Sequence, residues 1–340
     1  MSIQLARQFS RRRFLGEVTL VGTAALLGLR PGRSAAEPPP ETTRLRLMRK
    51  PAICEAAEYV AEELLQGEGF TEVRYVEKED LSYAEKALVS GEVDITMLVS
   101  PTFLLRLEAG DPLVLLAGVH VGCFELFGTE RVRGIRDLKG KTAAVTGLGG
   151  PEHVFLASIA AYVGLDPRQD IHWVSHPQTE AARLLAEGTV DAFLAFPPFA
   201  QELRAKQIGH VVLNSGYDRP WSHYFCCMVG SNREFVRKHP VATKRAVRAI
   251  LKAADVCALE PERVAQFLVD RGYVSRYDYA LQTMKEVPYG KWREYDPEDT
   301  VRFYALRLYE AGMLKSSPQK LIAQGTDWRF LNELKKELKG

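Results

Sequence analysis

The sequence is poor in the features that mark several large classes of protein. It has only five cysteines in 340 residues, an odd number without regular spacing, so it does not predict a disulfide framework. Its 45 basic and 43 acidic residues nearly cancel, whereas a nucleic-acid-binding protein needs clustered positive charge. The apolar stretch 18–29 is too short to cross a bilayer, which takes roughly 20 residues. These absences argue against a disulfide scaffold, a nucleic-acid partner and a membrane-spanning helix.

The amino terminus carries a targeting signal. Arg-Arg-Arg-Phe-Leu at residues 11–15 precedes the apolar stretch, and Ser-Ala-Ala at 34–36 ends it with small residues. A basic segment, a short apolar segment and such an end define a secretory signal, and paired arginines before Phe-Leu indicate the twin-arginine type. A basic surface helix or a membrane anchor is the alternative, but Glu17 interrupts the apolar run. We expect cleavage after Ala36 and a soluble periplasmic protein, without a cysteine there to carry a lipid.

Removing the signal changes the charge and leaves a chain too long for one core. Residues 1–36 carry six arginines and one glutamate, so residues 37–340 have 39 basic and 42 acidic residues and a formal net charge of −3. The slight basicity of the whole chain therefore belongs to the signal. The remaining ~300 residues exceed the usual single-core size of about 250. Two lobes or domains are expected.

Apolar segments alternate with helical patterns along the mature chain. Strands are predicted near residues 45–49, 73–76 and 93–99, with helices at 52–66 and 83–90 between them. Strands that alternate with helices of this length are typical of βαβ units and a mostly parallel sheet. The sequence thus predicts an α/β fold.

One segment of the chain is repeated. Leu-Val-Ser-Gly-Glu-Val-Asp at 88–94 is matched by Leu-Ala-Glu-Gly-Thr-Val-Asp at 185–191, an offset of 97 residues. At the same offset, the apolar strands that follow end at Pro101 and Pro198. Glycine just past a helix and proline just inside the next match the expected asymmetry of helix ends. The repeat predicts two lobes of similar topology.

A further motif carries a family resemblance. Ile-Arg-Asp-Leu-Lys-Gly-Lys at 135–141, followed by a strand, a glycine-rich turn and a helix, resembles the beginning of the second lobe of type II periplasmic binding proteins. The chain resembles in particular the nitrate/sulfonate/taurine branch, whose domain is shared with thiamine-pyrimidine synthases, over residues 43–340. The resemblance implies two lobes, each a mostly parallel sheet flanked by helices, with a ligand cleft at the hinge. It places a linker at 37–42, lobe I at 43–130 and 225–340, and lobe II at 135–222.

Open α/β sheets bind ligands beyond the carboxyl ends of their strands, and this rule selects the candidate site. The turn 147–150 is glycine-rich and opens a helix, so its backbone N–H groups are suited to an anion. An ordinary strand-to-helix turn is the alternative. The turn is neither a P-loop nor a dinucleotide fingerprint. The predicted ligand-binding residues lie in such loops or beside the crossings between lobes: Ile53, Cys54, Glu55, Ser100, Pro101, His120, Gly122, Gly147, Gly149, Gly150, Glu152, His153, Phe196 and His223.

Two groups of residues raise the question of metal chemistry. His120 and Cys123 are metal ligands by type, but a single His-x-x-Cys lacks the paired spacing of a zinc site, so packing is favoured. Cys226 and Cys227 fall in the apolar run 225–229. Thiamine-pyrimidine synthases carry a longer cysteine-rich run there, thought to serve iron-dependent chemistry, and only these two cysteines match it. A buried strand is favoured, and the sequence predicts no metal.

The residues contain no convincing nucleophile–base pair, so no enzyme activity, catalytic residue or cofactor is predicted. The resemblance implies a monomeric solute-binding component of an ABC importer. Such a protein captures a small solute by closing two lobes on it, and the permease and ATPase subunits at the inner membrane are its expected partners. We expect a small anionic organic solute, such as a sulfonate, a carboxylate or a nitrate-like ion. A thiamine-pyrimidine synthase-like enzyme and a periplasmic sensor input are the alternatives.

Overall fold

The computed structural model of the protein describes residues 37–78 and 81–338. The predicted twin-arginine signal, residues 1–36, lies outside the described residues, so its role in export stays a prediction. Pro39–Gly340 form one compact unit, which contains every helix and strand described below. Within the described residues, no helix is both long enough and apolar enough to span a membrane.

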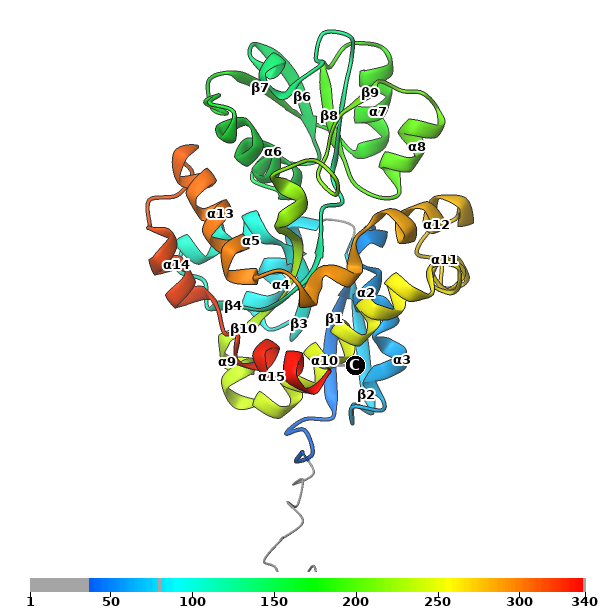
Figure 1. The fold of residues 1–340 in the computed structure, drawn as a ribbon, viewed down its shortest axis with the longest axis vertical. Coiled ribbons are helices and arrows are strands. Elements are labelled where there is room, and N and C mark those ends of the chain that lie inside the picture. Colours follow the sequence, from blue (N-terminus) through cyan, green and yellow to red (C-terminus); the bar gives the residue numbers. More distant parts are fainter. Residues whose placement is uncertain (1–36, 79–80, 339–340) are drawn as a thin grey trace, which may run out of the picture. The chain divides into compact units, whose positions relative to one another are not determined.

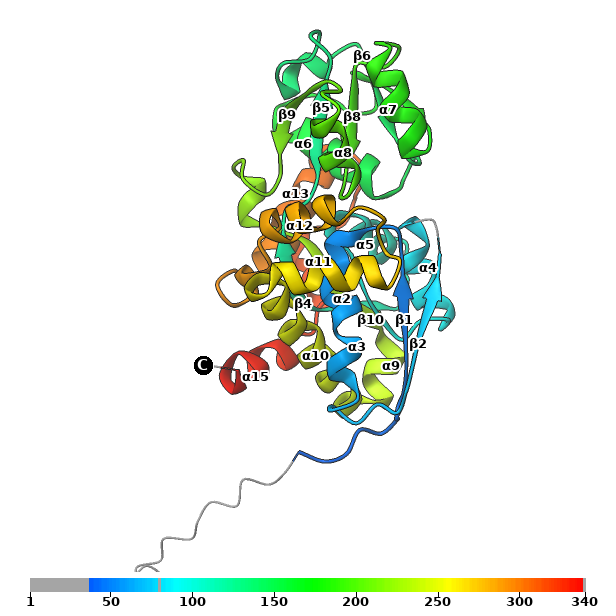
Figure 2. The same ribbon diagram turned by 90° about the vertical axis from the view of Figure 1, so that its right-hand side faces the viewer.

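Two groups of sheets and helices make up this unit (Figures 1 and 2). The strands of lobe I are β1 (Arg44–Arg49), β2 (Glu72–Glu77), β3 (Ile95–Val99), β4 (Leu113–Val121) and β10 (Phe225–Asn232). Its helices before the crossing are η1 (Ile53–Glu55), α2 (Ala56–Val60), α3 (Glu62–Leu65), η2 (Leu81–Tyr83), α4 (Ala84–Ser90) and α5 (Ser100–Glu108). Its helices after the return are α9 (Arg233–Lys238), α10 (Pro240–Leu259), α11 (Pro261–Asp270), α12 (Tyr277–Glu286), η5 (Tyr289–Arg293), α13 (Pro297–Glu310), α14 (Pro318–Gly325) and α15 (Arg329–Glu337).

Lobe II is formed by the middle of the chain. Its strands are β5 (Glu125–Gly128), β6 (Lys141–Val145), β7 (Ile171–Ser175), β8 (Ala192–Ala195) and β9 (His210–Asn214). Its helices are η3 (Ile135–Leu138), α6 (Pro151–Tyr162), α7 (Gln178–Ala186) and α8 (Phe199–Ala205), and η4 (Trp221–His223) lies on the return to lobe I.

The strands follow the same order in the two lobes. The sheet of lobe II has the order β7-β6-β8-β5-β9, and lobe I has β2 beside β1 and, in a second sheet, β3-β10-β4. In each lobe, one strand contributed by a crossing segment, β5 or β10, runs antiparallel to both of its neighbours. The α/β fold class is right. The pairs β1–β2, β6–β7 and β6–β8 are parallel, whereas β3-β10-β4 has only antiparallel pairs and β5 adds antiparallel pairs to the five-stranded sheet.

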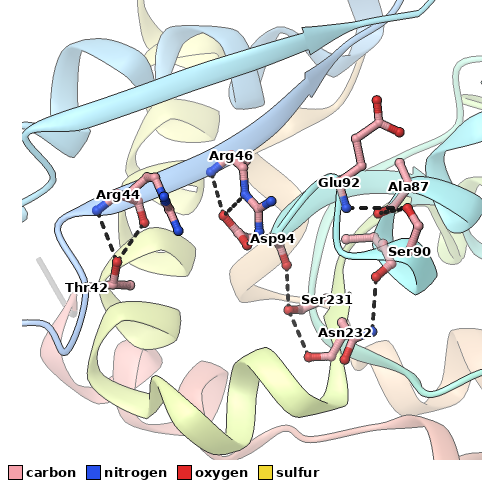
Figure 3. A network of polar contacts seen from close by, with 10 residues as sticks. Thr42, Arg44, Arg46, Ala87, Ser90, Glu92, Asp94, Ser231 and Asn232 are labelled. Carbon is pink, nitrogen blue, oxygen red and sulfur yellow. Dashed lines mark hydrogen bonds and ion pairs between the residues drawn. The ribbon is translucent and has the colours of Figure 1, made fainter.

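The 97-residue repeat has a physical basis in the structure. Gly91 and Gly188 follow α4 and α7 with φ of +71° and +70°, a left-handed conformation that glycine adopts at little cost. The backbone N–H and one carboxylate oxygen of Asp94 bond the backbone of Arg46 in β1, at 2.8 Å each (Figure 3). Asp191 bonds Thr142 in β6 in the same way, at 2.8 and 2.9 Å. Each aspartate therefore ties the start of one strand to its neighbour.

The same network anchors the return strand of lobe I. The Arg46 guanidinium also pairs with Asp94 at 2.5 Å, and the hydroxyl of Ser231 in β10 donates to the Asp94 carbonyl at 2.7 Å (Figure 3). The Asn232 side-chain amide donates to the Leu88 carbonyl at 3.1 Å. These bonds join the end of β10 to the segment between α4 and β3.

The two crossing segments lie against each other between the lobes. The Phe124 N–H and the Ser215 hydroxyl are joined at 2.9 Å, and the Ser215 N–H donates to the Phe124 carbonyl at 2.9 Å. The expected boundary of lobe I at residue 130 lies beyond β5, which belongs to the five-stranded sheet. We therefore propose that the chain first crosses at residues 122–124.

Candidate functional site

A cavity of about 270 Å³ lies where α4 and α5 of lobe I face the glycine-rich turn of lobe II. The walls come from the carboxyl-terminal side of the strands, as the crevice rule of open α/β sheets requires. The residues that line it are Ser82, Glu85, Lys86, Thr102, Leu105, Arg106, Thr146, Gly147, Leu148, Gly149, Gly150 and Pro151. Three of the predicted ligand-binding residues, Gly147, Gly149 and Gly150, are among them.

The glycine-rich turn is held by its own hydrogen bonds. The Gly149 N–H donates to Nδ1 of His153 at 3.1 Å, and the Gly150 N–H donates to the Gly147 carbonyl at 3.1 Å. Two of the donors expected to meet an anion are therefore engaged within the turn. Among the lining residues of the turn, the N–H groups of Gly147 and Leu148 remain for a ligand.

His153 supports this turn from the side. Burial lowers the pKa of His153, which favours the neutral imidazole whose Nδ1 accepts the Gly149 N–H. The ring stands edge-on to Trp173 with centroids 4.6 Å apart. His153 thus positions the turn and is not among the residues that line the cavity.

The charged side chains around the cavity leave it suited to an anion. Arg106 pairs with Asp111 at 2.6 Å, which reduces its attraction for a ligand. Lys86 is exposed and makes no ion pair with another described residue. Burial raises the pKa of Glu85, although a hydrogen bond with Thr102 opposes the shift, so the negative charge expected there is reduced. Lys86 is therefore the positive charge most available to a ligand in the cavity.

A buried polar cluster lies beneath the first loop of lobe I. Lys50 Nζ pairs with Glu55 at 2.6 Å and donates to the Met97 carbonyl at 2.6 Å. Glu58 accepts the N–H groups of Met48 and Met97 at 3.0 and 2.7 Å. Burial raises the pKa of Glu55 well above its usual value, and the Lys50 charge opposes the shift. Sequence reasoning missed Lys50, because a lysine at the end of a strand is ordinarily a solvated residue.

The cysteines of three separate segments meet next to this cluster. Cys54, Cys123, Cys226 and Cys227 are all buried and unbridged, and the Sγ atoms of Cys123 and Cys226 are 3.4 Å apart. His120 lies beside them and is fully buried. We call these five residues the thiol–imidazole cluster.

The cluster shifts the acidity of its own members. Burial opposes ionisation of Cys226, but hydrogen bonds from Cys123 and Cys227 more than offset it and lower its pKa to about 6. Hydrogen bonding, with Cys123 foremost, lowers the pKa of Cys227 to about 7. Burial disfavours the charged form of His120, yet its neighbour Cys227 raises the pKa of the ring to about 9. The favoured interpretation of Cys226 and Cys227, a buried strand, is confirmed, because both lie in β10 and are buried.

The other predicted residues lie around the crossings. The Ser100 hydroxyl donates to the carbonyls of Phe225 and Cys226 at 2.8 and 3.1 Å. It is therefore bonded to the backbone of the return strand β10. The ring of Phe196 stands edge-on to Phe124, with centroids 6.3 Å apart. Gly122 has a φ of +32° and lies against the backbone of the second crossing segment.

Of the remaining predicted residues, four are buried and one is exposed. Ile53, Glu55, Pro101 and Glu152 are buried and do not line the cavity. His223 is exposed, with its ring centroid 5.9 Å from that of Tyr295, and does not line the cavity either. The lining residues of α4 and α5 were missed, although Thr102 directly follows the predicted Ser100 and Pro101 in the sequence.

An ion pair also links the lobes at α8 and α12. Arg204 in α8 pairs with Glu125 at 3.1 Å and with Glu286 in α12 at 2.5 Å. The Tyr217 hydroxyl donates to the Glu286 carbonyl at 3.2 Å. The Gln201 side-chain amide also donates to Glu286 at 3.1 Å, so three residues of lobe II hold Glu286.

Comparison with known proteins gives a consistent result. Residues 39–268 match the NMT1-like family. The nitrate/nitrite binding protein NrtA of Nostoc sp. is 21% identical over 289 residues, which are 77% of this chain and 65% of that protein. This chain therefore spans just under two thirds of the length of that relative.

Solved structures share the fold. The periplasmic nitrate-binding protein NrtA from Synechocystis PCC 6803 superposes with a TM-score of 0.73 at 16% identity, over 89% of this chain and 90% of that chain. The alkanesulfonate-binding protein SsuA from Xanthomonas axonopodis pv. citri, bound to MOPS, gives a TM-score of 0.65 at 20% identity, over 83% and 96% of the two chains. The two-lobed type II fold and the resemblance to the nitrate/sulfonate branch, both predicted from the sequence, are confirmed.

Proposed function

Since the chain belongs to the NMT1-like family, we propose that it is a solute-binding protein that captures a small anion between its two lobes. The observation that carries this proposal is the cavity between α4, α5 and the 146–151 turn. Its walls belong to different lobes, so hinge closure would enclose a ligand there. Its volume of about 270 Å³ falls below the range typical of drug-sized ligands, which favours a small solute.

The chemistry of the cavity favours a negative charge on that solute. The turn that leads into α6 and the exposed Lys86 line it, and a helix N-terminus attracts anions. Nitrate-, carboxylate- and sulfonate-bearing molecules fit this description. The names of the relatives, nitrate- and alkanesulfonate-binding proteins, support the same class.

We further propose a periplasmic, non-catalytic role, with delivery of the solute to an ABC permease and its ATPase. The predicted export signal and the periplasmic relatives support the location. Binding requires hinge closure and no covalent step. An identified reaction product formed by the purified protein would contradict this proposal.

Anion capture can be tested at Gly147. A Cβ at this residue would meet no atom within 4 Å, and the backbone is not in the left-handed region, so a side chain is accommodated there. We expect Gly147→Asp to weaken anion binding by about tenfold or more, because a like charge at close range is repulsive. Gly147→Asn is the matched control, with the same shape and no charge, and it should bind nearly as the wild type does.

The measurement is a thermal-shift panel followed by calorimetry on the full chain. The panel contains nitrate, bicarbonate, short alkanesulfonates and carboxylates, because binding to the folded state raises its apparent stability. If a ligand is found and the two Gly147 variants bind it equally well, the cavity is not the site of capture.

A second prediction concerns the contact between α8 and α12. Glu286→Gln is expected to reduce ligand affinity about threefold, because a partly exposed ion pair contributes up to about 1 kcal/mol to the closed arrangement. Glu202→Gln is the control, since Glu202 pairs with Lys206 within α8 and does not span the lobes. Equal affinities of these two variants in calorimetry would show that the Arg204–Glu286 pair does not contribute to closure.

A further inference from the structure

Five potential metal ligands meet at the hinge end of lobe I. Cys54 comes from η1, His120 from the end of β4, Cys123 from the first crossing, and Cys226 and Cys227 from the start of β10. Ligand atoms of Cys54, His120 and Cys123 all lie within 4.8 Å of one another, and so do those of Cys123, Cys226 and Cys227. Cys123 belongs to both triads. The two triads therefore form one continuous cluster.

The spacing of the cluster agrees with coordination by a single ion. Zinc–sulfur bonds of 2.3 Å place two tetrahedral sulfur ligands about 3.8 Å apart. The Cys123 and Cys226 sulfurs are 3.4 Å apart, and the other ligand atoms of each triad are no more than 4.8 Å apart. Side-chain movements of up to about 1 Å would bring ligand atoms 4.8 Å apart to the tetrahedral separation.

The imidazole of His120 is an independent sign of a ligand. Its Nδ1 is 3.2 Å from the Val121 carbonyl, while its Nε2 is buried without a hydrogen-bond partner among the described residues. A buried polar atom left unpaired costs about 1–3 kcal/mol. A metal-bound histidine typically donates its other ring N–H to a backbone carbonyl or a carboxylate. His120 already makes the supporting contact and keeps the second nitrogen for the cluster.

The cluster adjoins the buried charged groups of lobe I. Several thiolates around one cation leave excess negative charge, which is costly in a dry interior. The buried Lys50 ammonium lies close enough to Cys227 for their charges to interact. Its ion pair with Glu55 places a cation, two carboxylates and the thiols in one buried region.

We propose that Cys54, His120, Cys123, Cys226 and Cys227 form a structural site in which at most four of them bind one thiophilic d10 cation, Zn²⁺ or Cu⁺. Thiolate and imidazole ligands select these metals over hard cations. Closed sites, without an open coordination position for substrate, are structural, and every member of this cluster is at most 8% exposed. The bound ion would fasten the first loop of lobe I to the first crossing and the return strand.

The site is independent of anion capture. None of its five residues lines the cavity at the glycine-rich turn, so loss of the metal and loss of anion binding are separate outcomes. A metal that stiffens the hinge would nevertheless stabilise the frame on which the cavity is built.

The test is the metal content of the full chain, purified without chelators from cells supplied with zinc or with copper. About one ion per chain is expected by elemental analysis, since metal binding and folding are coupled at such sites. Cys226→Ser and His120→Phe should each lower this content at least fivefold. Cys257→Ser is the matched control, because Cys257 is equally buried but lies in α10 outside the cluster, and it should keep the full content.

A spectroscopic measurement covers variants that fold poorly. Reduced wild-type protein reconstituted with Co²⁺ should show thiolate-to-cobalt charge-transfer absorption, which Zn²⁺ then displaces. Competition with a Cu⁺-specific chelator distinguishes copper from zinc as the preferred ion. Failure of the folded, reduced protein to bind Zn²⁺, Cu⁺ or Co²⁺ would overturn the proposal. A Cys123–Cys226 disulfide in protein purified anaerobically would overturn it too, because it removes two of the ligands.

Discussion

Gly122→Ala should destabilise the protein by about 3–4 kcal/mol. An added Cβ would lie 2.2 Å from the carbonyl carbon and oxygen of Ser215 and from the nitrogen of Gly216. These are backbone atoms of the second crossing segment, so no side-chain rotation relieves the clash. Overpacking costs about 1–3 kcal/mol, and a left-handed backbone adds about 1–2 kcal/mol for a residue with a Cβ. The crossings would have to separate at the point where they are hydrogen-bonded.

Urea unfolding followed by circular dichroism measures this effect. Gly91→Ala is the control, because Gly91 has a φ of +71° and no atom within 4 Å of its added Cβ. Gly91→Ala should lower the free energy of unfolding by only about 1 kcal/mol, because it adds a left-handed backbone penalty but no steric clash. If the two variants unfold at the same urea concentration, the close approach of the crossings is not what makes glycine necessary at residue 122.

Lys50→Met should have an effect of similar size, for an electrostatic reason. The ammonium group is buried with Glu55 at 2.6 Å and bonds the Met97 carbonyl, so its removal leaves buried carboxyl groups without a counter-charge. Removing one partner of a buried ion pair typically costs about 3–5 kcal/mol. Methionine is only one atom shorter than lysine, so little of this cost would come from lost volume.

The double variant Lys50→Met/Glu55→Gln separates charge from packing. Once both charges are gone, part of the lost stability should return, since a neutral replacement of a buried pair is often tolerated. Lys139→Met removes a pair of comparable type with Asp170 whose lysine is 70% exposed, and it should cost less than about 1 kcal/mol. Equal losses for Lys50→Met and Lys139→Met in thermal unfolding would contradict the role of the buried charge.

Much of the fold is encoded locally. The repeat at 88–94 and 185–191 predicts two lobes of one topology, and the structure places Asp94 and Asp191 in matching bonds to β1 and β6. Glycine after a helix and aspartate at the start of a strand act through neighbouring backbone atoms, so their pattern is visible in the sequence. The direction of β5 and β10 is not, because a buried apolar strand has the same pattern in either direction.

The candidate site was predictable on one side only. The turn 147–150 could be identified from its glycines and from the strand and helix around it, whereas Lys86 and Thr102 belong to ordinary helices of the other lobe. Whether such side chains face the turn depends on how the lobes are joined. The sequence predicts that His153 meets a ligand, and in the structure its ring accepts the Gly149 N–H.

By itself, the sequence determined the α/β class, the two similar lobes and the crevice side of their sheets. Only the tertiary structure decided which residues meet there. Cys54, Cys123 and Cys226 are separated by more than 60 residues in each interval, so no local spacing connects them. They come together because the chain crosses between the lobes twice and the return strand β10 inserts between β3 and β4. Local patterns specify elements, and contacts between distant segments form only when those elements pack.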